Sequence, residues 1–377
     1  MKSIYITLQD FDDINHQGVN NKIKDQVTAF NKYGFRMEYI GVEKNNVVVF
    51  NTNNEKKILD NFDSKLSKRR KILLKSSEYI INNKIDYIYI RYFKSDKLFI
   101  KFLKDIRKYV KKIDLEIATY PYECEVVKKF SIQNILAQVD KHYRKFLYKY
   151  IDNIITFSSD KKIFSIPTIQ IENGIDIDRI KKRNYKKKEN IINYTMIGVA
   201  NLNFWHGYDR VIRGLGEYYK IDQNKKVIFN IVGNGKELNN LKKMLISLGI
   251  SEYVKFKGSK SGNDLDEEFN NADIAIGSLG IHRLGLKNVS TLKLKEYIAR
   301  GIPFIYAYND NAIDNNFKYA KKELNDESTI NIKRILEFYD YIFNESLIEE
   351  MREISKKFTW EVQVKKIIDI YMHNKNY

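Results

Sequence analysis

The segment from residue 290 to residue 305 combines residue types that can bind an anion. Ser290 and Thr291 precede a helical pattern at Leu292–Ala299, and a helix N-terminus offers unpaired backbone N–H groups at the positive end of the helix dipole. Lys293 lies in the first turn, where a cation opposes the dipole and costs stability unless it faces an anion. Glu296 follows one turn after the start and can accept hydrogen bonds from hydroxyl groups. The pattern predicts a phosphate-binding helix, and the alternative is a surface helix with a solvated Lys and Glu.

Three glycines and one aromatic loop lie where strands lead into helices. Gly233 and Gly235 form a Gly-x-Gly turn, which serves either backbone approach to a phosphate ligand or tight turning alone. Gly18 precedes the first helical pattern and is either a point of close approach to a ligand or an ordinary loop glycine. Trp205 stands in the loop Phe204–Gly207. An exposed indole there is costly unless it stacks on a ligand or packs under the helix.

Strand and helix patterns alternate along the whole chain, which predicts α/β architecture with parallel sheets and right-handed crossovers. The first half has strand patterns at Lys2–Leu8, Arg36–Val42, Tyr87–Tyr92, Asp114–Thr119, Asn153–Phe157 and Thr168–Ile171. The second half repeats the alternation, with strand patterns at Tyr194–Val199, Lys226–Val232, Val254–Lys257, Ile274–Ile276 and Phe304–Ala307. Ligands bind such folds at the carboxyl ends of the strands and between domains.

The chain has 377 residues, which is too long for one ordinary domain and fits two. We expect an N-terminal Rossmann-like domain at residues 1–178 and a second one at residues 191–357. Residues 179–190 form a charged, apolar-poor stretch that we interpret as the linker between them. Residues 358–377 are expected to form a C-terminal helix that packs back on the N-terminal domain.

The net charge of +18 favours anionic partners such as phosphorylated small molecules, acidic lipid headgroups or nucleic acid. Residues 1–178 carry 32 Lys and Arg against 23 Asp and Glu, and the linker supplies most of the excess in the second half. The alternative is a surface that is simply lysine-coated. The single cysteine, Cys124, excludes an intramolecular disulfide and Cys-rich metal sites. With no long apolar run and no signal-peptide pattern at the start, we expect a cytoplasmic protein.

Four segments resemble, in order and spacing, the family-four retaining glycosyltransferases of GT-B fold. They are Ile154–Asp178, ending in IQIENGIDID; Gly198–Ile212, GVANLNFWHGYDRVI; Ile231–Leu241, IVGNGKELNNL; and Ser290–Ile305, STLKLKEYIARGIPFI. The resemblance runs over nearly the whole chain. It implies two Rossmann-like domains with parallel sheets facing across a cleft that holds the active site. It also implies transfer of a sugar from a UDP- or GDP-sugar to an acceptor hydroxyl, with retention. The segments WHGYDR and LKLKEY are similar in sequence to those of a bacterial subgroup linked to surface-polysaccharide and capsule assembly.

The resemblance assigns the nucleotide-sugar to the second domain. It places the diphosphate over the helix start, where Lys293 acts as a catalytic residue by stabilising charge on the leaving β-phosphate. The ribose then lies near Glu296, the second glutamate of the family's E-x7-E pattern. Such enzymes need no metal or other cofactor, because helix dipoles and cationic side chains hold the diphosphate. The donor-binding residues expected are Gly18, Asn201, Trp205, His206, Gly207, Gly233, Gly235, Asn288, Ser290, Thr291, Lys293 and Glu296.

Several positions depart from the family pattern. The family clamps the diphosphate with an arginine and a lysine, and Asn201 and His206 occupy those positions here. The first glutamate of E-x7-E falls on Asn288, after an insertion that includes Leu279–Lys287. The family's cleft histidine is also missing from LEIATYPYECE, residues 115–125. These departures indicate either cleft chemistry peculiar to a subgroup or a catalytically inactive GT-B subunit that supports a partner transferase.

The acceptor side is expected at Thr119, Tyr120 and Tyr122, which follow a strand and therefore lie at the sheet edge where ligands bind. Tyrosines can stack on a pyranose and bond its hydroxyls, which makes Tyr120 a catalytic as well as a binding candidate. Glu125 can orient an acceptor hydroxyl or act as a base. Arg91 ends the strand YIYIRY and can meet phosphate if the role of the missing arginine has moved. The alternative is structural tyrosines and solvated carboxylates.

Residues 132–150 read as a basic amphipathic helix, with Lys141, Arg144, Lys145 and Lys149 between apolar positions. Such a helix can lie on an anionic leaflet and approach a lipid-linked saccharide acceptor. The alternative is that its apolar stripe packs on the sheet. The protein is therefore expected to be cytoplasmic or peripheral at the inner face of the membrane.

Two further functions stay in view. A nucleotide-sugar epimerase of the same fold needs more cleft carboxylates and histidines than the sequence places. A nucleic-acid-binding protein is supported by charge alone, without a recognised motif, so no nucleic-acid partner is expected. The sequence assigns no oligomeric state.

Overall fold

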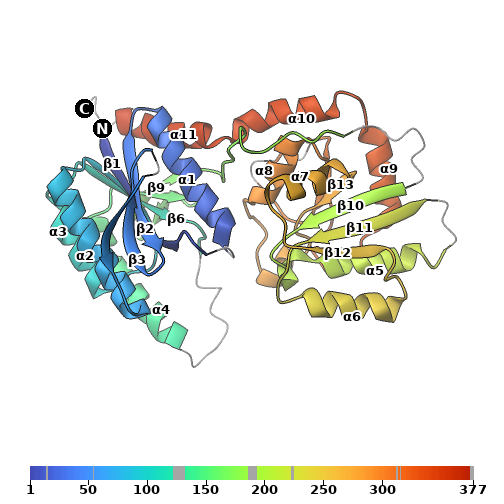
Figure 1. Ribbon diagram of the computed structural model, residues 1–377, viewed down its shortest axis with the longest axis horizontal. Helices are drawn as coiled ribbons and strands as arrows, with labels where there is room; N and C mark the ends of the chain where they lie inside the picture. Colours follow the sequence, from blue (N-terminus) through green and yellow to red (C-terminus); the bar gives the residue numbers. More distant parts are fainter. Residues whose placement is uncertain are drawn as a thin grey trace. The chain divides into compact units, whose positions relative to one another are not determined.

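The computed structural model describes residues 1–13, 16–53, 55–121, 132–185, 193–221, 225–310, 313–314 and 316–373. The chain divides into two compact units, both visible in Figure 1. The first unit consists of Met1–Gly174 together with Trp360–Tyr377, and the second is the continuous stretch Ile175–Thr359. Each unit has its own sheet and its own hydrophobic core.

The sheet of the first unit has the strand order β4-β3-β2-β1-β5-β6-β7-β9-β8. The strands from β2 to β9 in this order pair in parallel, whereas β3, β4 and β8 are antiparallel to their neighbours. The bounds are β1 Lys2–Asp10, β2 Arg36–Glu43, β3 Asn46–Phe50, β4 Lys56–Asn61, β5 Tyr87–Arg91, β6 Lys112–Ile117, β7 Asn153–Thr156, β8 Lys162–Ile163 and β9 Ile166–Gln170.

Helices cover both faces of this sheet (Figure 1). Strand side chains alternate between faces, so Ile4 and Ile6 of β1 join one core cluster while Tyr5 joins the other. The Ile4 cluster includes residues of α2, Lys65–Asn83, and α3, Lys97–Arg107. The Tyr5 cluster includes residues of α1, Gln17–Lys32, and α11, Trp360–His373. The other helices found among the described residues of this unit are α4 Ile132–Tyr143 and the 3-10 helix η3 Arg144–Lys149.

The sheet of the second unit is parallel throughout, in the order β12-β11-β10-β13-β14-β15. This is the strand order of a Rossmann fold. Its strands are β10 Asn193–Val199, β11 Lys226–Val232, β12 Val254–Gly258, β13 Ile274–Ile276, β14 Phe304–Tyr306 and β15 Ala320–Lys322. Its helices are η4 Phe204–His206, α5 Tyr208–Tyr218, α6 Leu238–Leu248, α7 Gly262–Asn270, η5 Ile281–Leu284, α8 Leu292–Arg300, α9 Ile332–Ile342, α10 Leu347–Ser355 and η6 Lys356–Phe358.

The predicted fold class, two α/β units built on parallel sheets, is confirmed. The strand patterns at Lys226–Val232 and Ile274–Ile276 coincide with β11 and β13. Strands β3, β4, β8 and β15 were not predicted. In the part of the chain that the structure describes, no helix has both the length and the apolar character needed to cross a membrane.

The basic segment after Asp178 packs on the second unit as far as Tyr185. The Arg183 side chain is buried and donates hydrogen bonds to the carbonyl oxygens of Gly301 and Ala272, both at 2.7 Å. Its burial lowers the pKa of Arg183 to about 10. The stretch interpreted from its sequence as a linker therefore contains an arginine whose side chain is part of the second unit.

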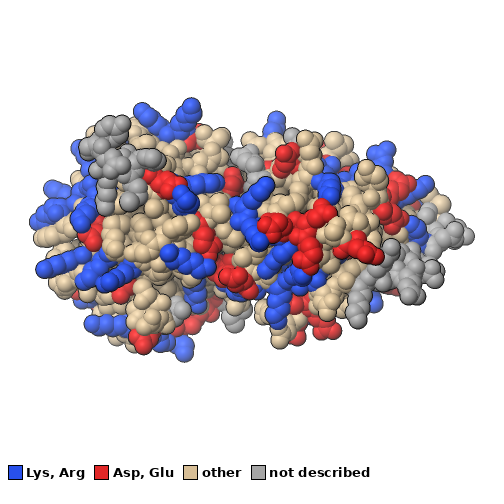
Figure 2. Space-filling model, turned by 90° about the horizontal axis from the view of Figure 1, so that it is seen from above, with Lys and Arg blue, Asp and Glu red and all other residues tan. Residues whose placement is uncertain are grey.

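Figure 2 shows how the charge is spread over one face of the molecule. Basic side chains predominate over the visible part of the first unit, at left, whereas acidic and basic side chains are interspersed on the second unit. Positive charge on this face is therefore concentrated on the first unit.

We expect Gly174→Ala to destabilise the first unit. A Cβ atom at Gly174 would lie 2.5 Å from the Trp360 ring, so α11 would have to shift, at a cost of about 1–3 kcal/mol. Gly18→Ala is the matched control, because its Cβ would meet no atom within 4 Å and alanine favours a helix. The chain has two Trp residues, so Trp360 fluorescence in a Trp205→Phe background reports denaturant unfolding of this unit. Equal midpoints for the two variants would contradict the prediction.

Candidate functional site

The start of α8 is held by side chains from elsewhere in the second unit. Thr291 is the N-cap residue in extended conformation, yet its side chain makes no capping bond and its hydroxyl lies 2.6 Å from the Tyr308 hydroxyl. Its backbone N–H donates to Asp310 at 3.1 Å. Because the Thr291 hydroxyl bonds to Tyr308 instead, the N-cap side chain does not satisfy the first-turn N–H groups of α8, which can meet an anionic acceptor.

A buried ion pair fixes this arrangement. The Lys295 ammonium donates to both carboxylate oxygens of Asp310, at 2.7 and 2.6 Å, and to the Ser290 hydroxyl at 3.0 Å. Both charged side chains are fully buried. Sequence reasoning missed Lys295 and Asp310. Lys295 lies on α8 and Asp310 follows β14, and no local sequence pattern relates the two positions.

Lys293 is in the opposite situation. Its Nζ atom is buried and has no hydrogen-bond partner within the described ranges, and it lies 5.8 Å from the centre of the Tyr208 ring. Burial lowers the pKa of Lys293 to about 7, although Glu296 acts in the opposite direction. A desolvated ammonium beside an uncapped helix start is a site that gains from a bound anion.

Glu296 is oriented by its own helix. Arg300, one turn later, donates from Nε to the Glu296 carboxylate at 2.9 Å and from Nη1 to Asp266 at 2.7 Å. The Glu296 side chain stays partly exposed. Lys293 and Glu296 are three residues apart and so share a face of α8.

The loop after β10 reaches the same region. His206 is buried, and its Nδ1 accepts the Asn203 N–H at 3.1 Å, so a neutral ring carries its proton on Nε2. Burial and the nearby Lys293 lower the pKa of His206 to about 2, which keeps it neutral. Trp205 is half-buried and packs edge-on against Phe204, with ring centres 5.1 Å apart. Asn201 is exposed in the same loop.

Two expected donor-binding glycines have a structural requirement of their own. Gly233 and Gly235 both have positive φ, and Cβ atoms there would lie 1.9 Å from the Ala200 carbonyl oxygen and 2.3 Å from that of Leu202. The Leu202 N–H donates to the Asn234 carbonyl at 2.6 Å. These glycines let the loops after β10 and β11 touch. Gly207 has φ +66°, and a Cβ atom there would similarly collide with the backbone of the loop after β13.

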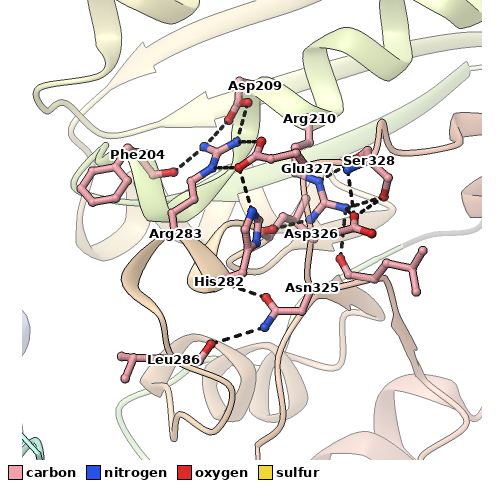
Figure 3. Close-up of polar contacts among 12 residues, drawn as sticks. Phe204, Asp209, Arg210, His282, Arg283, Leu286, Asn325, Asp326, Glu327 and Ser328 are labelled. Atoms are coloured by element: carbon pink, nitrogen blue, oxygen red, sulfur yellow. Dashed lines mark hydrogen bonds and ion pairs between the residues drawn. The ribbon is translucent and has the colours of Figure 1, made fainter. Parts of the chain in front are cut away.

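The insertion Leu279–Lys287 is fastened by an arginine fork, shown in Figure 3. Arg283 donates to both carboxylate oxygens of Asp209, at 2.9 and 2.8 Å, and to both of Glu327, each at 2.6 Å. Arg283 and His282 lower the pKa of Glu327 to about 2. The fork also donates to the Phe204 carbonyl oxygen at 2.6 Å. The insertion therefore supports the loop that carries Trp205.

Asn288, in the place of the first family glutamate, directly follows that insertion. Its side-chain oxygen accepts a hydrogen bond from Asn309 at 2.9 Å, and the backbones of these two residues form a parallel bridge. The structure thus brings Trp205, His206 and Gly207 to the same sheet edge as Lys293. Asn288 ties the following segment to the chain after β14.

In the first unit, Arg91 is committed to a carboxylate. It donates to the fully buried Glu116 at 2.8 Å, which also accepts from Tyr89 and Gln26 and pairs with Lys22 at 3.2 Å. Burial would raise the pKa of Glu116, but Lys22 and Arg91 outweigh it and lower the pKa to about 2.

The other candidate residues of the first unit are exposed or half-buried, or fall outside the described residues. Gly18 is exposed in the first turn of α1, and Thr119 is exposed after β6. Tyr120 is half-buried, with its ring edge-on to Phe164 at 6.0 Å between centres. Tyr122 and Glu125 fall in residues 122–131, outside the described residues.

Comparisons with known proteins show which part of the sequence matches a family and which solved structures are similar to this one. Residues 176–313 match the family described as Glycosyl transferases group 1. Among curated proteins, none matches the sequence. A glycosyltransferase from Rickettsia africae ESF-5 has a TM-score of 0.66 at 13% identity, covering 99% of this chain and 98% of its own.

Two further solved structures are similar over their whole lengths. Sucrose-phosphate synthase from Thermosynechococcus elongatus has a TM-score of 0.69 at 14% identity, covering 100% of this chain and 99% of its own. HepE from Anabaena in complex with UDP has a TM-score of 0.64 at 13% identity, covering 99% and 100%. The protein has the GT-B fold. Within this GT-B protein, α8 and the loop after β10 both belong to the segment that matches the group 1 family.

The depressed pKa of Lys293 predicts a pH-dependent cost to the folded protein. The unfolded chain binds this proton up to the ordinary Lys pKa of about 10.4, so the penalty is complete below pH 7 and fades as pH rises toward 10. Lys293→Met should therefore stabilise the second unit at pH 6 by more than about 1.4 kcal/mol, the equivalent of one pKa unit, and have little effect at pH 10. Trp205 fluorescence in a Trp360→Phe background follows this unit during denaturation.

The control for this measurement is Lys287→Met, which removes an exposed lysine from the same unit. Its effect should be small and independent of pH. A Lys293→Met variant that destabilises the protein at every pH would show that the ammonium has a partner in solution.

Proposed function

We propose that this GT-B protein transfers a sugar from a nucleotide-sugar donor, a UDP- or GDP-sugar, to a hydroxyl of a saccharide or lipid-linked saccharide. The observation that carries the proposal is the Nζ atom of Lys293, which is buried and has no hydrogen-bond partner in the described part of the chain, beside the uncapped start of α8. A diphosphate is the ligand class that satisfies both features, because it brings two negative charges and several acceptor oxygens. The match of residues 176–313 to group 1 glycosyl transferases supports the same conclusion.

In this proposal the diphosphate lies over the first turn of α8, with the β-phosphate near Lys293. An approaching anion raises the pKa of Lys293, so the ammonium is charged when charge grows on the leaving phosphate. Glu296, held by Arg300, accepts hydrogen bonds from the ribose hydroxyls. Helix N–H groups and Lys293 do this work without a metal ion or another cofactor.

The acceptor belongs to the first unit in this scheme, at Thr119 and Tyr120. The acceptor hydroxyl attacks on the leaving-group face, which gives retention without a protein nucleophile. We propose a hexosyl donor and a role in bacterial surface-polysaccharide or capsule assembly, at the cytoplasmic side of the membrane. Support comes from the resemblance of residues 154–307 and from HepE, which has been solved with UDP and with UDP-glucose.

A second candidate function is a catalytically inactive subunit that binds a nucleotide-sugar and supports a partner transferase. The observation that favours it is His206, which replaces a family lysine and, with a pKa of about 2, supplies no positive charge to a diphosphate. This candidate predicts nucleotide binding without release of sugar from any UDP- or GDP-sugar.

We expect Lys293→Ala to act on turnover and Glu296→Ala to act on donor affinity. The contact with the leaving phosphate strengthens in the transition state, so Lys293→Ala should lower kcat roughly 10²-fold or more. The ribose contact is alike in the ground and transition states, so Glu296→Ala should mainly raise KM, and Glu296→Gln should raise it less. Steady-state rates of sugar transfer or donor hydrolysis measure both effects.

Lys287→Ala, which removes an exposed lysine, is the matched control and should retain full turnover. Thermal shifts with UDP, GDP and their sugars identify the base before kinetics begin, since a ligand at 100 times its Kd stabilises by about 2.7 kcal/mol. Normal kcat in Lys293→Ala would remove the diphosphate from α8. Donor binding without turnover in the unmutated protein would select the inactive subunit.

We expect Tyr120→Ala to raise the KM for the acceptor and leave the Kd for the nucleotide unchanged, because its ring lies in the first unit. Tyr120→Phe keeps the ring and should retain most of the acceptor affinity if stacking dominates. Acceptor titration at saturating donor measures the effect. An equal loss of nucleotide affinity would place Tyr120 at the donor instead.

A further inference from the structure

A cavity of about 460 Å³ opens in the first unit between η3 and the turn that joins β8 to β9. Six residues line it: Lys141, Arg144, Lys145, Tyr148, Phe164 and Ser165. Three of the six are cationic and none is acidic. The first four of these residues come from the last turn of α4 and from η3.

The cations differ in how they are held. Arg144 is largely buried, with its guanidinium 4.7 Å from the centre of the Phe164 ring and 3.7 Å from the Asp140 carboxylate. Lys141 and Lys145 are exposed, and among the described residues neither has an ion-pair or hydrogen-bond partner. One fixed guanidinium and two adaptable ammonium groups form a convergent set of donors for a phosphate group.

The far wall of the cavity is built at a conformational cost. Phe164 and Ser165 form the two-residue turn of the β8–β9 hairpin, and both have positive φ, at 51° and 66°. Asn and Gly are the residues that favour such turns. The turn instead presents a phenyl ring, which contacts both Arg144 and Tyr120.

Exposed apolar side chains flank the cavity. Tyr148, in its lining, is 55% exposed, and Phe146 beside it is 37% exposed. On α4, Ile135 and Leu136 are 67% and 55% exposed, but both point more than about 100° round the helix axis from Lys141, so they do not line the cavity. The apolar stripe of this helix is therefore only partly packed on the sheet. A ligand with a phosphate headgroup and a hydrocarbon tail matches both parts of this surface.

We propose that this cavity binds the phosphate headgroup of a membrane lipid, with Lys141, Arg144 and Lys145 as its donors. Charge complementarity with an anionic leaflet and the exposed apolar residues beside the cations select a lipid over a soluble phosphate ester. The site goes beyond the proposed sugar transfer, which requires only a donor and an acceptor hydroxyl. A lipid phosphate bound there would lie near Tyr120, because the Phe164 ring contacts both Arg144 and Tyr120.

The test is flotation of the full-length protein with vesicles of phosphatidylcholine alone and with one third phosphatidylglycerol, at physiological salt. Binding is expected only to the anionic vesicles. Each lysine near an anionic surface is worth about a fivefold change in affinity, so Lys141→Glu/Lys145→Glu should weaken binding at least tenfold. The matched control, Lys97→Glu/Lys101→Glu, reverses two exposed lysines of α3 with the same spacing and the same change in net charge, and should weaken it less than threefold.

A second variant tests the wall of the cavity. Phe164→Asn suits the positive φ at this turn and removes the ring, so the fold should be retained while vesicle affinity falls several-fold. Equal losses in both lysine pairs would show attraction by net charge alone and overturn the site. Equal flotation with neutral and anionic vesicles would overturn it too. Binding of millimolar glycerol phosphate, lost in Lys141→Glu/Lys145→Glu, without any vesicle binding would assign the cavity to a soluble phosphate ester.

Nucleotide binding separates this inference from the proposed function. UDP-glucose affinity, measured on the same variants without vesicles, should be unchanged in Lys141→Glu/Lys145→Glu. A reduced nucleotide affinity in that variant would place the cavity in the donor site and contradict a separate lipid site. Failure of the unmutated protein to bind any nucleotide would defeat the sugar-transfer proposal and leave the vesicle result standing.

Discussion

The ion pair between Lys295 and Asp310 is the constraint on which the nucleotide side depends. Both groups are fully buried, and breaking such a pair by removing one partner costs about 3–5 kcal/mol because the other charge is left uncompensated. Asp310 also binds the Thr291 N–H, and Lys295 binds the Ser290 hydroxyl. One pair thereby sets the position of the chain as it enters α8, and the helix start needs no cap from its own N-cap side chain.

Two lysines two residues apart on α8 therefore have opposite roles. Lys295 is neutralised within the protein, so its burial is compensated by Asp310. The Nζ atom of Lys293 is buried without a hydrogen-bond partner among the described residues, and the cost of its desolvation is offset by the rest of the second unit. The difference follows from helix geometry, because residues two apart point to different sides of a helix. The arginine fork of Arg283 and the contacting loops at Gly233 and Gly235 add further contacts among the loops of the same unit.

The fold class could be predicted from the sequence because buried parallel strands are apolar runs, as in β11, KVIFNIV. Edge elements could not. β4, KKILDN, is mostly exposed, and the turn before β3 is made by Lys44 and Asn45 at positive φ rather than by glycine. For the candidate site, Lys293 was visible as a cation that opposes a helix dipole. No local pattern encodes the contacts around it, because they join residues that meet only in the folded chain. Examples are the Lys295–Asp310 pair and the bond between Glu116 and Arg91, and the same holds for the absence of a hydrogen-bond partner for Lys293 among the described residues.

The return of α11 to the first unit has a consequence for the order of synthesis. The chain leaves that unit at Gly174 and re-enters it at Trp360, whose ring packs against Gly174, while Ile175 and Thr359 pair as a bridge at the base of the second unit. The second unit is thus an insertion whose two ends meet, and on the ribosome it is complete before the first unit is. Until Trp360, Val364 and Ile367 emerge, the face of the first sheet carrying Tyr5 and Phe30 lacks part of its cover. Part of the apolar surface of the nascent first unit therefore stays exposed until α11 has been translated.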